Sequence, residues 1–279
     1  MGLLDSISVG VSGMQSQSFA LQNISGNIAN SQTTAYKTTD TSFEDLLNAQ
    51  AAGIPSADGV QATSITSNLT QGSIQSSSIS TNMAINGDGY FSVEAATSTD
   101  GNGNPTFSGA ATEYSRRGDF QIDGNGYLVN GAGDYLMGTS VDANGNSTGG
   151  TPQLLQFNSS TLPSGDGTLQ GISIASNGTV EGSFSNGQTV ALANVSLSTF
   201  SGEQFLAQNA DGSYSPTAQS GAAISGASGT IVGGALESSN TDITGQFTAM
   251  IQTQQAYSAN TKVVTVSDEM LQTLTNMTI

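Results

Sequence analysis

The two ends of this chain have a different sequence character from its middle, and this contrast constrains the fold most strongly. Residues 1 to 30 carry apolar side chains in steps of three and four residues, the spacing of one helical face, and residues 241 to 279 do the same. We therefore expect one helix at each end, pairing with each other or with copies of themselves. The apolar series are Leu4, Ile7, Val11, Met14, Leu21 and Ile28, then Ile243, Phe247, Met250, Tyr257, Val264, Val266, Met270, Leu274 and Met277.

The middle of the chain is rich in Gly, Ser, Thr and Asn and contains short alternating runs that are typical of strands. Tight-turn signals separate these runs at Gly87-Asp88-Gly89, Ser176-Asn177-Gly178 and Ser185-Asn186-Gly187. The pattern predicts a central antiparallel β domain, and residues 201–230 read as a polar connection.

These observations together predict an α+β fold with three regions. Residues 1–32 and 241–279 would form a helical inner domain that assembles like a coiled coil. Residues 33–75 read as an extended connecting segment with one or two strands at most. Residues 76–240 would form the β-rich outer domain.

Composition excludes several classes of function. The chain has 279 residues with no Cys and no His, so it has no thiol nucleophile, no Ser-His pair and no zinc site of the usual ligands. Its formal net charge is −17, with four basic residues against 21 acidic ones. Nucleic acids and anionic membranes require clustered basic residues, so neither is an expected partner. The chain also has no apolar stretch of the roughly 20 residues that a membrane span requires.

The acidic residues also give little support for an enzyme or a metal site. Loops beginning at Asp100, Asp123 and Asp142 resemble the start of a calcium loop, but turn chemistry explains such Asp, Asn and Gly clusters without an ion. Neighbouring acids such as Glu44 and Asp45 point about 100° apart on a helix and cannot flank one bond. We expect no catalytic residue, no metal and no cofactor.

Four segments carry a family resemblance. "NISGNIANSQTTAYK" followed by "FEDLL" looks like the N-terminal signature of the bacterial flagellar rod and hook proteins, and "GALESSNTDITGQFTAMIQTQQAYSANTKVVTVSDEMLQTL" resembles their C-terminal signature. "AINGDGYFSV" and "YSRRGDFQIDGNGYLVNGAGDYLMG" are similar to elements of their β domain. The matches span both ends and the first β region, and all four basic residues lie inside them.

The resemblance implies a structural subunit of the bacterial flagellum that polymerises into a tube, most like the extracellular hook, which joins the rod to the filament. The implied partners are copies of the chain, neighbouring rod and hook-filament junction proteins, the hook cap and the flagellar type III export apparatus. Hook proteins usually carry a further outer domain, and only residues 151–168 stand where it would sit. The distal or proximal rod protein of the basal body is therefore the alternative, and a secreted adhesin or surface-layer protein is the alternative outside the family.

We expect the assembly surface to combine the apolar faces of both ends with the basic residues and the signature positions. Because the chain is so acidic, we also expect its basic residues to have carboxylate partners, with Arg116 and Arg117 serving subunit contacts. The expected interface residues are Leu4, Ile7, Val11, Met14, Leu21, Ile28, Asn30, Tyr36, Lys37, Arg116, Arg117, Phe247, Met250, Ile251, Tyr257, Lys262, Val266, Met270 and Leu274.

Overall fold

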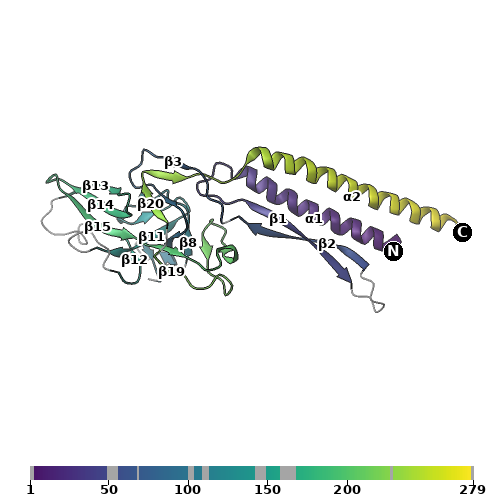
Figure 1. Cartoon of the computed structure of the whole chain (residues 1–279), viewed down its shortest axis with the longest axis horizontal. Coiled ribbons are helices and arrows are strands. Elements are labelled where there is room, and N and C mark those ends of the chain that lie inside the picture. Colours follow the sequence, from purple (N-terminus) through teal and green to yellow (C-terminus); the bar gives the residue numbers. More distant parts are fainter. Residues whose placement is uncertain are drawn as a thin grey trace. The chain divides into compact units, whose positions relative to one another are not determined.

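The computed structural model describes residues 3–48, 56–67, 69–99, 104–108, 113–141, 149–157, 168–226 and 229–277. A helix opens the chain, a helix closes it, and antiparallel strands lie between them, so the fold is α+β as predicted (Figure 1). The elements are α1 (Leu3–Ala29), β1 (Thr39–Asn48), β2 (Ser56–Thr66), β3 (Ile74–Ser76), β4 (Met83–Asn86), β5 (Tyr90–Ala95), β6 (Ser98–Thr99), β7 (Pro105–Thr106), β8 (Glu113–Ser115), β9 (Gln121–Ile122), β10 (Leu128–Val129), β11 (Asp134–Ser140), β12 (Gln153–Leu154), β13 (Leu169–Ile174), β14 (Thr179–Phe184), β15 (Thr189–Val195), β16 (Leu197–Thr199), the 3-10 helix η1 (Glu203–Phe205), β17 (Ala207–Gln208), β18 (Tyr214–Ser215), β19 (Ile224–Ser225), β20 (Thr230–Gly233), β21 (Ala235–Glu237) and α2 (Ile243–Met277).

The chain divides into two compact units. The first, here called the helical unit, contains Met1–Gln32, Lys37–Ser67 and Thr241–Ile279. The second, here called the β unit, contains Thr33–Tyr36 and Asn68–Asn240. Within the described residues, neither helix has an apolar stretch that would let it cross a membrane.

In the helical unit, α1 and α2 lie side by side and run in opposite directions (Figure 1). Asp5 stands in the first turn of α1, where a negative charge is favoured by the helix dipole. The end of α1 is closed by Asn30, whose backbone N–H and side-chain Nδ2 both donate to the carbonyl of Gly26 at 3.0 Å. These local signals explain why the first helix ends where the sequence predicts.

The helical unit also contains a β hairpin that the sequence analysis treated as a connecting segment. Strands β1 and β2 pair antiparallel from Thr39 opposite Thr66 to Asn48 opposite Ser56, with a register shift between Leu46 and Leu47. The hairpin packs along α1 (Figure 1). Threonine-rich alternating sequence favours strands, but a lone hairpin is marginal in water, so packing against α1 supplies the support that the sequence does not reveal.

The β unit is organised around one 13-stranded sheet. Its main path is β13-β14-β15-β11-β5-β8-β18-β17, and every pairing in the path is antiparallel. The other pairings described in this unit form two-stranded sheets: β20 with β4, β21 with β3, and β6 with β7. The main core is closed to water, with the largest apolar side chains drawn from strands far apart in the sequence: Met83, Ile85, Phe91, Val93, Phe120, Leu128, Leu136 and Val180 are all 0% exposed.

Turn predictions in the β unit had mixed outcomes. Gly178 and Gly187 adopt φ angles of 81° and 80°, and they connect β13 to β14 and β14 to β15 in hairpins, as predicted. Gly87 and Gly89 are also left-handed, but the strands on either side do not pair with each other. Strand β4 pairs with β20, whereas β5 pairs with β8, β11 and β16. The turn is therefore real, and the hairpin that it suggested is wrong.

Residues 201–230 differ from the polar connection that the sequence predicted. They contribute η1, β17, β18 and β19, and Leu206 and Tyr214 join a buried aromatic cluster with Tyr90, Tyr114 and Phe200. Tyr90 packs edge-on against both Phe200 and Tyr214, with ring centroids 5.9 and 5.5 Å apart. A few widely spaced aromatic residues thus anchor a segment whose average composition looks like a loop.

Candidate functional site

The apolar residues predicted on the C-terminal helix lie mostly in solvent. Phe247, Ile251, Met270 and Leu274 are 50%, 56%, 51% and 55% exposed. Tyr257 and Val266 are also exposed, whereas Met250 is half-buried. Large apolar side chains left this open on one helix are a surface that association with another chain would remove from water.

The N-terminal helix is more enclosed. Ile7, Val11, Met14, Leu21 and Ile28 are all half-buried, while the side chain of Leu4 lies outside the described residues. The contacts on α1 come from two sides, because α2 and the β1–β2 hairpin both pack against it. The two helices therefore differ in how far their apolar side chains are buried, although their sequences show similar apolar patterns.

The seam between α1 and α2 combines small and polar residues with members of the predicted apolar series. A Cβ atom at Gly10 would lie 2.9 Å from Cγ2 of Val264, and one at Gly13 would lie 2.7 Å from Nδ2 of Asn260. Ser267 is the buried residue of α2. Glycine permits this close approach, so the prediction that the helices pair is right. Of the predicted apolar series, Val264 lies in the seam and Met14 contacts Thr261 of α2 at 3.5 Å, whereas the small and polar seam residues were not predicted.

Asn27 fastens three elements of the helical unit and was not among the predicted site residues. Its Nδ2 donates to the carbonyl of Thr39 at 3.0 Å and to Oε1 of Gln246 at 3.2 Å, while its Oδ1 accepts the backbone N–H of Thr39 at 2.9 Å. The side chain is 1% exposed. Because this side-chain amide bonds both the N–H and the C=O of Thr39, it fixes the position of β1 along the axis of α1.

A polar stripe on α1 continues this attachment toward the other end of the hairpin. Ser16 Oγ donates to the carbonyl of Val60 at 2.9 Å, and Ser12 Oγ accepts the Val60 N–H at 3.2 Å. Asn23 Nδ2 donates to Oγ1 of Thr41 at 2.9 Å. Ser12, Ser16, Asn23 and Asn27 recur in steps of four and seven residues, so their helical spacing is the signal that could have revealed the hairpin's docking face.

The signature residues after α1 occupy a tight bend. Asn30 and Tyr36 are half-buried, and Lys37 is 2% exposed. Ala35 has a φ angle of 56°, a left-handed conformation that is uncommon for a residue with a Cβ atom. Its backbone N–H donates to the carbonyl of Glu237 at 2.8 Å within the β unit.

Arg116 has the carboxylate partner that we predicted, but it is an internal residue. Its Nη1 lies 3.8 Å from Oε2 of Glu237 and donates to the carbonyl of Gly87 at 2.9 Å, and its guanidinium lies over the Tyr90 ring at 5.1 Å. The Arg116 and Glu237 side chains are 4% and 0% exposed. A guanidinium enclosed in this way cannot reach a neighbouring subunit, so the expectation of a surface contact is wrong for the chain in this conformation.

Arg117 is paired at the surface. Its Nε and Nη2 donate to the two carboxylate oxygens of Asp119 at 3.2 and 2.7 Å, and this hydrogen bonding raises the pKa of Arg117. Both side chains remain partly exposed, at 21% and 24%. Lys262, the other basic residue on the predicted surface, is exposed on α2.

Three carboxylates meet in the β unit. Oxygens of Glu113, Asp134 and Asp211 lie within 4.8 Å of one another, and Ser213 Oγ donates to Glu113 and Asp211 at 2.9 and 2.8 Å. Burial raises the pKa of Asp134 to about 6; the nearby Asp211 and Glu113 charges add to this shift, whereas a hydrogen bond from Asn130 and the charge of Arg117 oppose it. The cluster joins β8, β11 and the β17–β18 turn.

The calcium-like loop at Asp123 is accounted for by turn chemistry. Asp123 Oδ1 accepts the backbone N–H groups of Asn125 and Tyr127 at 2.9 and 2.7 Å, so this carboxylate oxygen closes the turn on its own backbone. The loops that begin at Asp100 and Asp142 lie outside the described residues.

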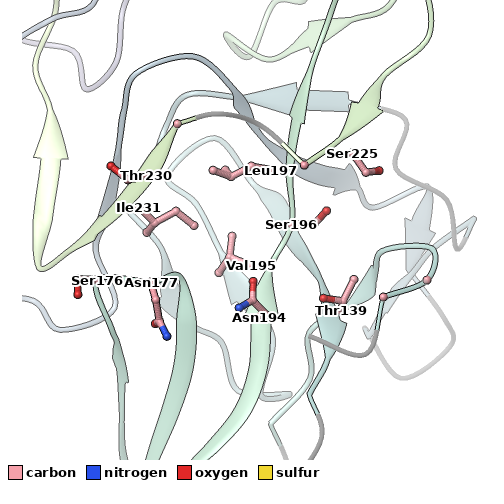
Figure 2. Close-up of a pocket in the computed structure, with 14 residues that line it drawn as sticks. Thr139, Ser176, Asn177, Asn194, Val195, Ser196, Leu197, Ser225, Thr230 and Ile231 are labelled. Carbon is pink, nitrogen blue, oxygen red and sulfur yellow. The ribbon is translucent and has the colours of Figure 1, made fainter. Parts of the chain in front are cut away.

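The β unit also has a pocket of about 490 Å³. Figure 2 shows Thr139, Ser176, Asn177 and Asn194 around it, with Val195 and Ile231 among the apolar side chains. Among the residues that the structure describes, those that line the pocket are neither charged nor aromatic. Such a lining has no general acid or base and no activated nucleophile, so the pocket itself does not indicate catalysis.

The sequence of this chain is similar to two protein-family models and to several characterised proteins. The family described as "Flagellar hook protein FlgE/F/G D1 domain" matches residues 84–182, and "Flagellar basal body rod FlgEFG protein C-terminal" matches residues 232–277. The chain is 30% identical over 294 residues to the flagellar basal-body rod protein FlgG of Bacillus subtilis, with 99% of both chains covered. It is 28% identical to FlgG of Buchnera aphidicola over 99% of this chain and 100% of the relative. It is 35% identical over 164 residues to the flagellar hook protein FlgE of Brucella melitensis, covering 58% of this chain and 38% of the relative.

Proposed function

Because the chain belongs to the bacterial flagellar rod and hook protein family, we propose that it is a structural subunit of the tubular axis of the flagellum and that α2 is its main assembly surface. This family is structural, which agrees with the lack of catalytic signals in the sequence. The mechanism that we propose is mechanical: helices of neighbouring copies pack into a tube, and the β units form its wall.

The observation that carries this proposal is the exposure of apolar side chains on α2. Phe247, Ile251, Met270 and Leu274 are about half exposed in the free chain. Fully burying a large apolar side chain stabilises a structure by about 1.5–3 kcal/mol. Because these four side chains are already about half buried, covering them gains roughly 3–6 kcal/mol, which is comparable with the lower end of the roughly 4–15 kcal/mol cost of association. The other exposed apolar residues of α2, Val263, Val266 and Met277, add to this driving force.

Two positions along the axis are compatible with these properties. The full-length correspondence with rod proteins favours the rod, because the chain covers 99% of the B. subtilis relative and 38% of the B. melitensis hook relative. The hook, our first expectation from the sequence, is the second candidate. It is supported by the higher identity over the part shared with hook proteins, 40% over 116 residues with FlgE of Helicobacter pylori.

We propose that the chain assembles with copies of itself and with the neighbouring axial components: rod and hook-filament junction proteins and, in the hook, the hook cap. Delivery by the flagellar type III export apparatus belongs to the same proposal. The assembly residues that remain candidates are the exposed apolar residues of α2, the half-buried apolar residues of α1, and Arg117, Lys262, Asn30 and Tyr36. Lys37 is 2% exposed, so in this conformation it is no more available to a neighbouring copy than Arg116.

Polymerisation of the purified chain tests the proposed function. Dilute monomer should remain dispersed, and concentrated protein should form tubes of uniform diameter in electron micrographs. Failure to form tubes at any concentration or salt condition would contradict the proposal. Immunogold labelling of intact flagella from the source bacterium would then separate the two positions, because the rod crosses the cell envelope and the hook lies outside it.

A further inference from the structure

Apart from Tyr257, which is 40% exposed, the exposed apolar residues of α2 form two separate strips. The first strip is Ile243, Phe247 and Ile251, which are 44%, 50% and 56% exposed. The second strip lies further along the helix, and its members are 47% to 80% exposed: Val263, Val266, Met270, Leu274 and Met277.

The two strips lie on opposite flanks of the helix pair. At about 100° per residue, the centre of the first strip is about 140° around the axis of α2 from the centre of the second. The seam with α1, marked by Asn260, Val264 and Ser267, lies between them. One strip is about 135° from the seam in one direction, and the other is about 85° from it in the opposite direction.

Polar residues replace each strip where the other one runs. Near the first strip, the side of α2 that carries the second strip further along the helix is polar, with Gln252 and Gln255 both exposed. Near the second strip, the side of α2 that carries the first strip nearer the start of the helix is polar, with Thr265, Glu269 and Gln272 also exposed. One straight neighbouring element that covered both strips would have to cross from one flank of α2 to the other.

The charge distribution indicates what covers the strips. Asp5 is the charged residue of α1, and α2 carries Lys262, Asp268 and Glu269, so the two helices together account for a net −2 of the chain's −17. Two copies can therefore bring these helices together with little repulsion. A basic partner would instead be drawn to the acidic remainder of the chain, so the near-neutral helices favour a second copy as the occupant.

We propose that the two strips dock on two different copies of the chain, one on each flank of α2. This inference rests on the proposed function, because it specifies how the subunit meets its neighbours in the polymer. Two contacts on opposite flanks and at different heights relate each copy to the next by a rotation with a translation. A contact of this kind does not close into a dimer and grows into an open helical assembly.

Photocrosslinking with two probes on one subunit tests the number of neighbours. A chain with p-benzoylphenylalanine at both Ile251 and Leu274 is mixed with a large excess of the unmodified chain, assembled and irradiated. Two neighbours predict covalent trimers on a denaturing gel, whereas each single-probe chain should give dimers only. Tubes in which the double-probe chain gives only dimers overturn this inference alone. If the unmodified chain forms no tubes, the proposed function is overturned as well.

Paired alanine variants of the full chain test the strips separately. Phe247→Ala with Ile251→Ala and Met270→Ala with Leu274→Ala should each raise the minimum concentration for tube formation at least about tenfold, because each removes two apolar side chains from a contact. The matched controls, Gln252→Ala with Gln255→Ala and Thr265→Ala with Gln272→Ala, should change it less than about threefold. If only one strip responds, or if the controls respond as strongly, the two-neighbour arrangement is wrong.

Discussion

The two units of this molecule treat their apolar residues in opposite ways. In the β unit, Phe91, Phe120 and Leu136 are 0% exposed. In the helical unit, Phe247 and Ile251 are about half exposed. The β unit therefore closes its main core within one chain, although Leu69 and Ile224 stay exposed, whereas the largest apolar side chains of α2 lie mostly at the surface. The contrast fits the proposal that the β unit folds by itself and that α2 serves assembly.

The largest test of this comparison is proteolysis of the dilute monomer. We expect a non-specific protease to cut within both terminal helices and leave a fragment of about residues 69–240, because the helical unit leaves most large apolar side chains of α2 exposed and segments with little buried apolar contact open readily. In assembled tubes, both helices should become resistant. Mass spectrometry of the fragments provides the measurement, and equal resistance of both units in the monomer would contradict the comparison.

A matched pair of phenylalanines compares the two units side chain by side chain. Phe120→Ala should lower the free energy of unfolding of the β unit by about 3–5 kcal/mol, because it leaves a cavity in a closed core. Phe247→Ala should change monomer stability by less than about 1 kcal/mol, since that side chain is half exposed. Denaturant titration of both variants at low protein concentration measures the difference. Similar losses would show that the exposure of Phe247 is not maintained in solution.

The two neighbouring arginines give a similar contrast within the β unit. Arg116→Ala should cost about 3–5 kcal/mol, because it removes one partner of a buried ion pair together with the guanidinium that lies over the Tyr90 ring. Arg117→Ala removes a partly exposed pair with Asp119 and should cost less than about 1 kcal/mol. Thermal unfolding of the monomer separates these outcomes, and an unchanged melting temperature for Arg116→Ala would contradict the internal role that we assign to it.

The carboxylate cluster predicts a pH dependence for the β unit. The pKa of Asp134 is raised from 3.8 to about 6 by folding, so its contribution is fully present below pH 4 and is lost as the pH rises through 6. This loss corresponds to roughly 2–3 kcal/mol. Asp134→Asn should therefore exceed the parent chain in stability at pH 8 and match it near pH 4. Asp88→Asn, at an exposed turn, is the control, and identical pH profiles for parent and Asp134→Asn would contradict the prediction.

The smallest expected effect is at the bend after α1. Ala35→Gly should stabilise the β unit by about 0.5–1 kcal/mol, because glycine relieves the cost of a left-handed φ angle. Ala175→Gly, in a turn of the same unit where the backbone is not left-handed, should destabilise it by a similar amount through chain entropy. Equilibrium unfolding of the two variants decides the sign. A loss at both positions would indicate that Ala35 carries no strain.

The parts of the fold that were predictable from sequence depend on local chemistry. Both terminal helices follow from apolar spacing, and the turns at Gly178 and Gly187 follow from the left-handed backbone that glycine accepts easily. The β1–β2 hairpin was not predicted, because its position depends on hydrogen bonds from Ser16 and Asn27 to residues more than ten positions away. Non-local polar contacts of this kind leave no periodic apolar signal.

The candidate site was predictable in type but not in orientation. Apolar spacing predicted a helix at the α2 position and proposed it for assembly, yet it could not tell which side would face α1. That choice depends on Gly10 and Gly13, which let α1 approach Val264 and the polar Asn260 closely. The burial of Arg116 was equally hidden, because Glu237 lies far away in the sequence and reaches it only through the fold.

The contacts of Gly13 with Asn260 and of Asn27 with Gln246 have a mechanical consequence. They pin α1 to α2 at two points separated by about 21 Å along α1, at 1.5 Å per residue. A single contact would let the two helices rotate about it, whereas two separated contacts restrict both the axial offset and the crossing angle of the helices. We therefore expect a twisting load on one helix of an assembled subunit to be shared by the other, so that the pair resists torsion better than either helix alone.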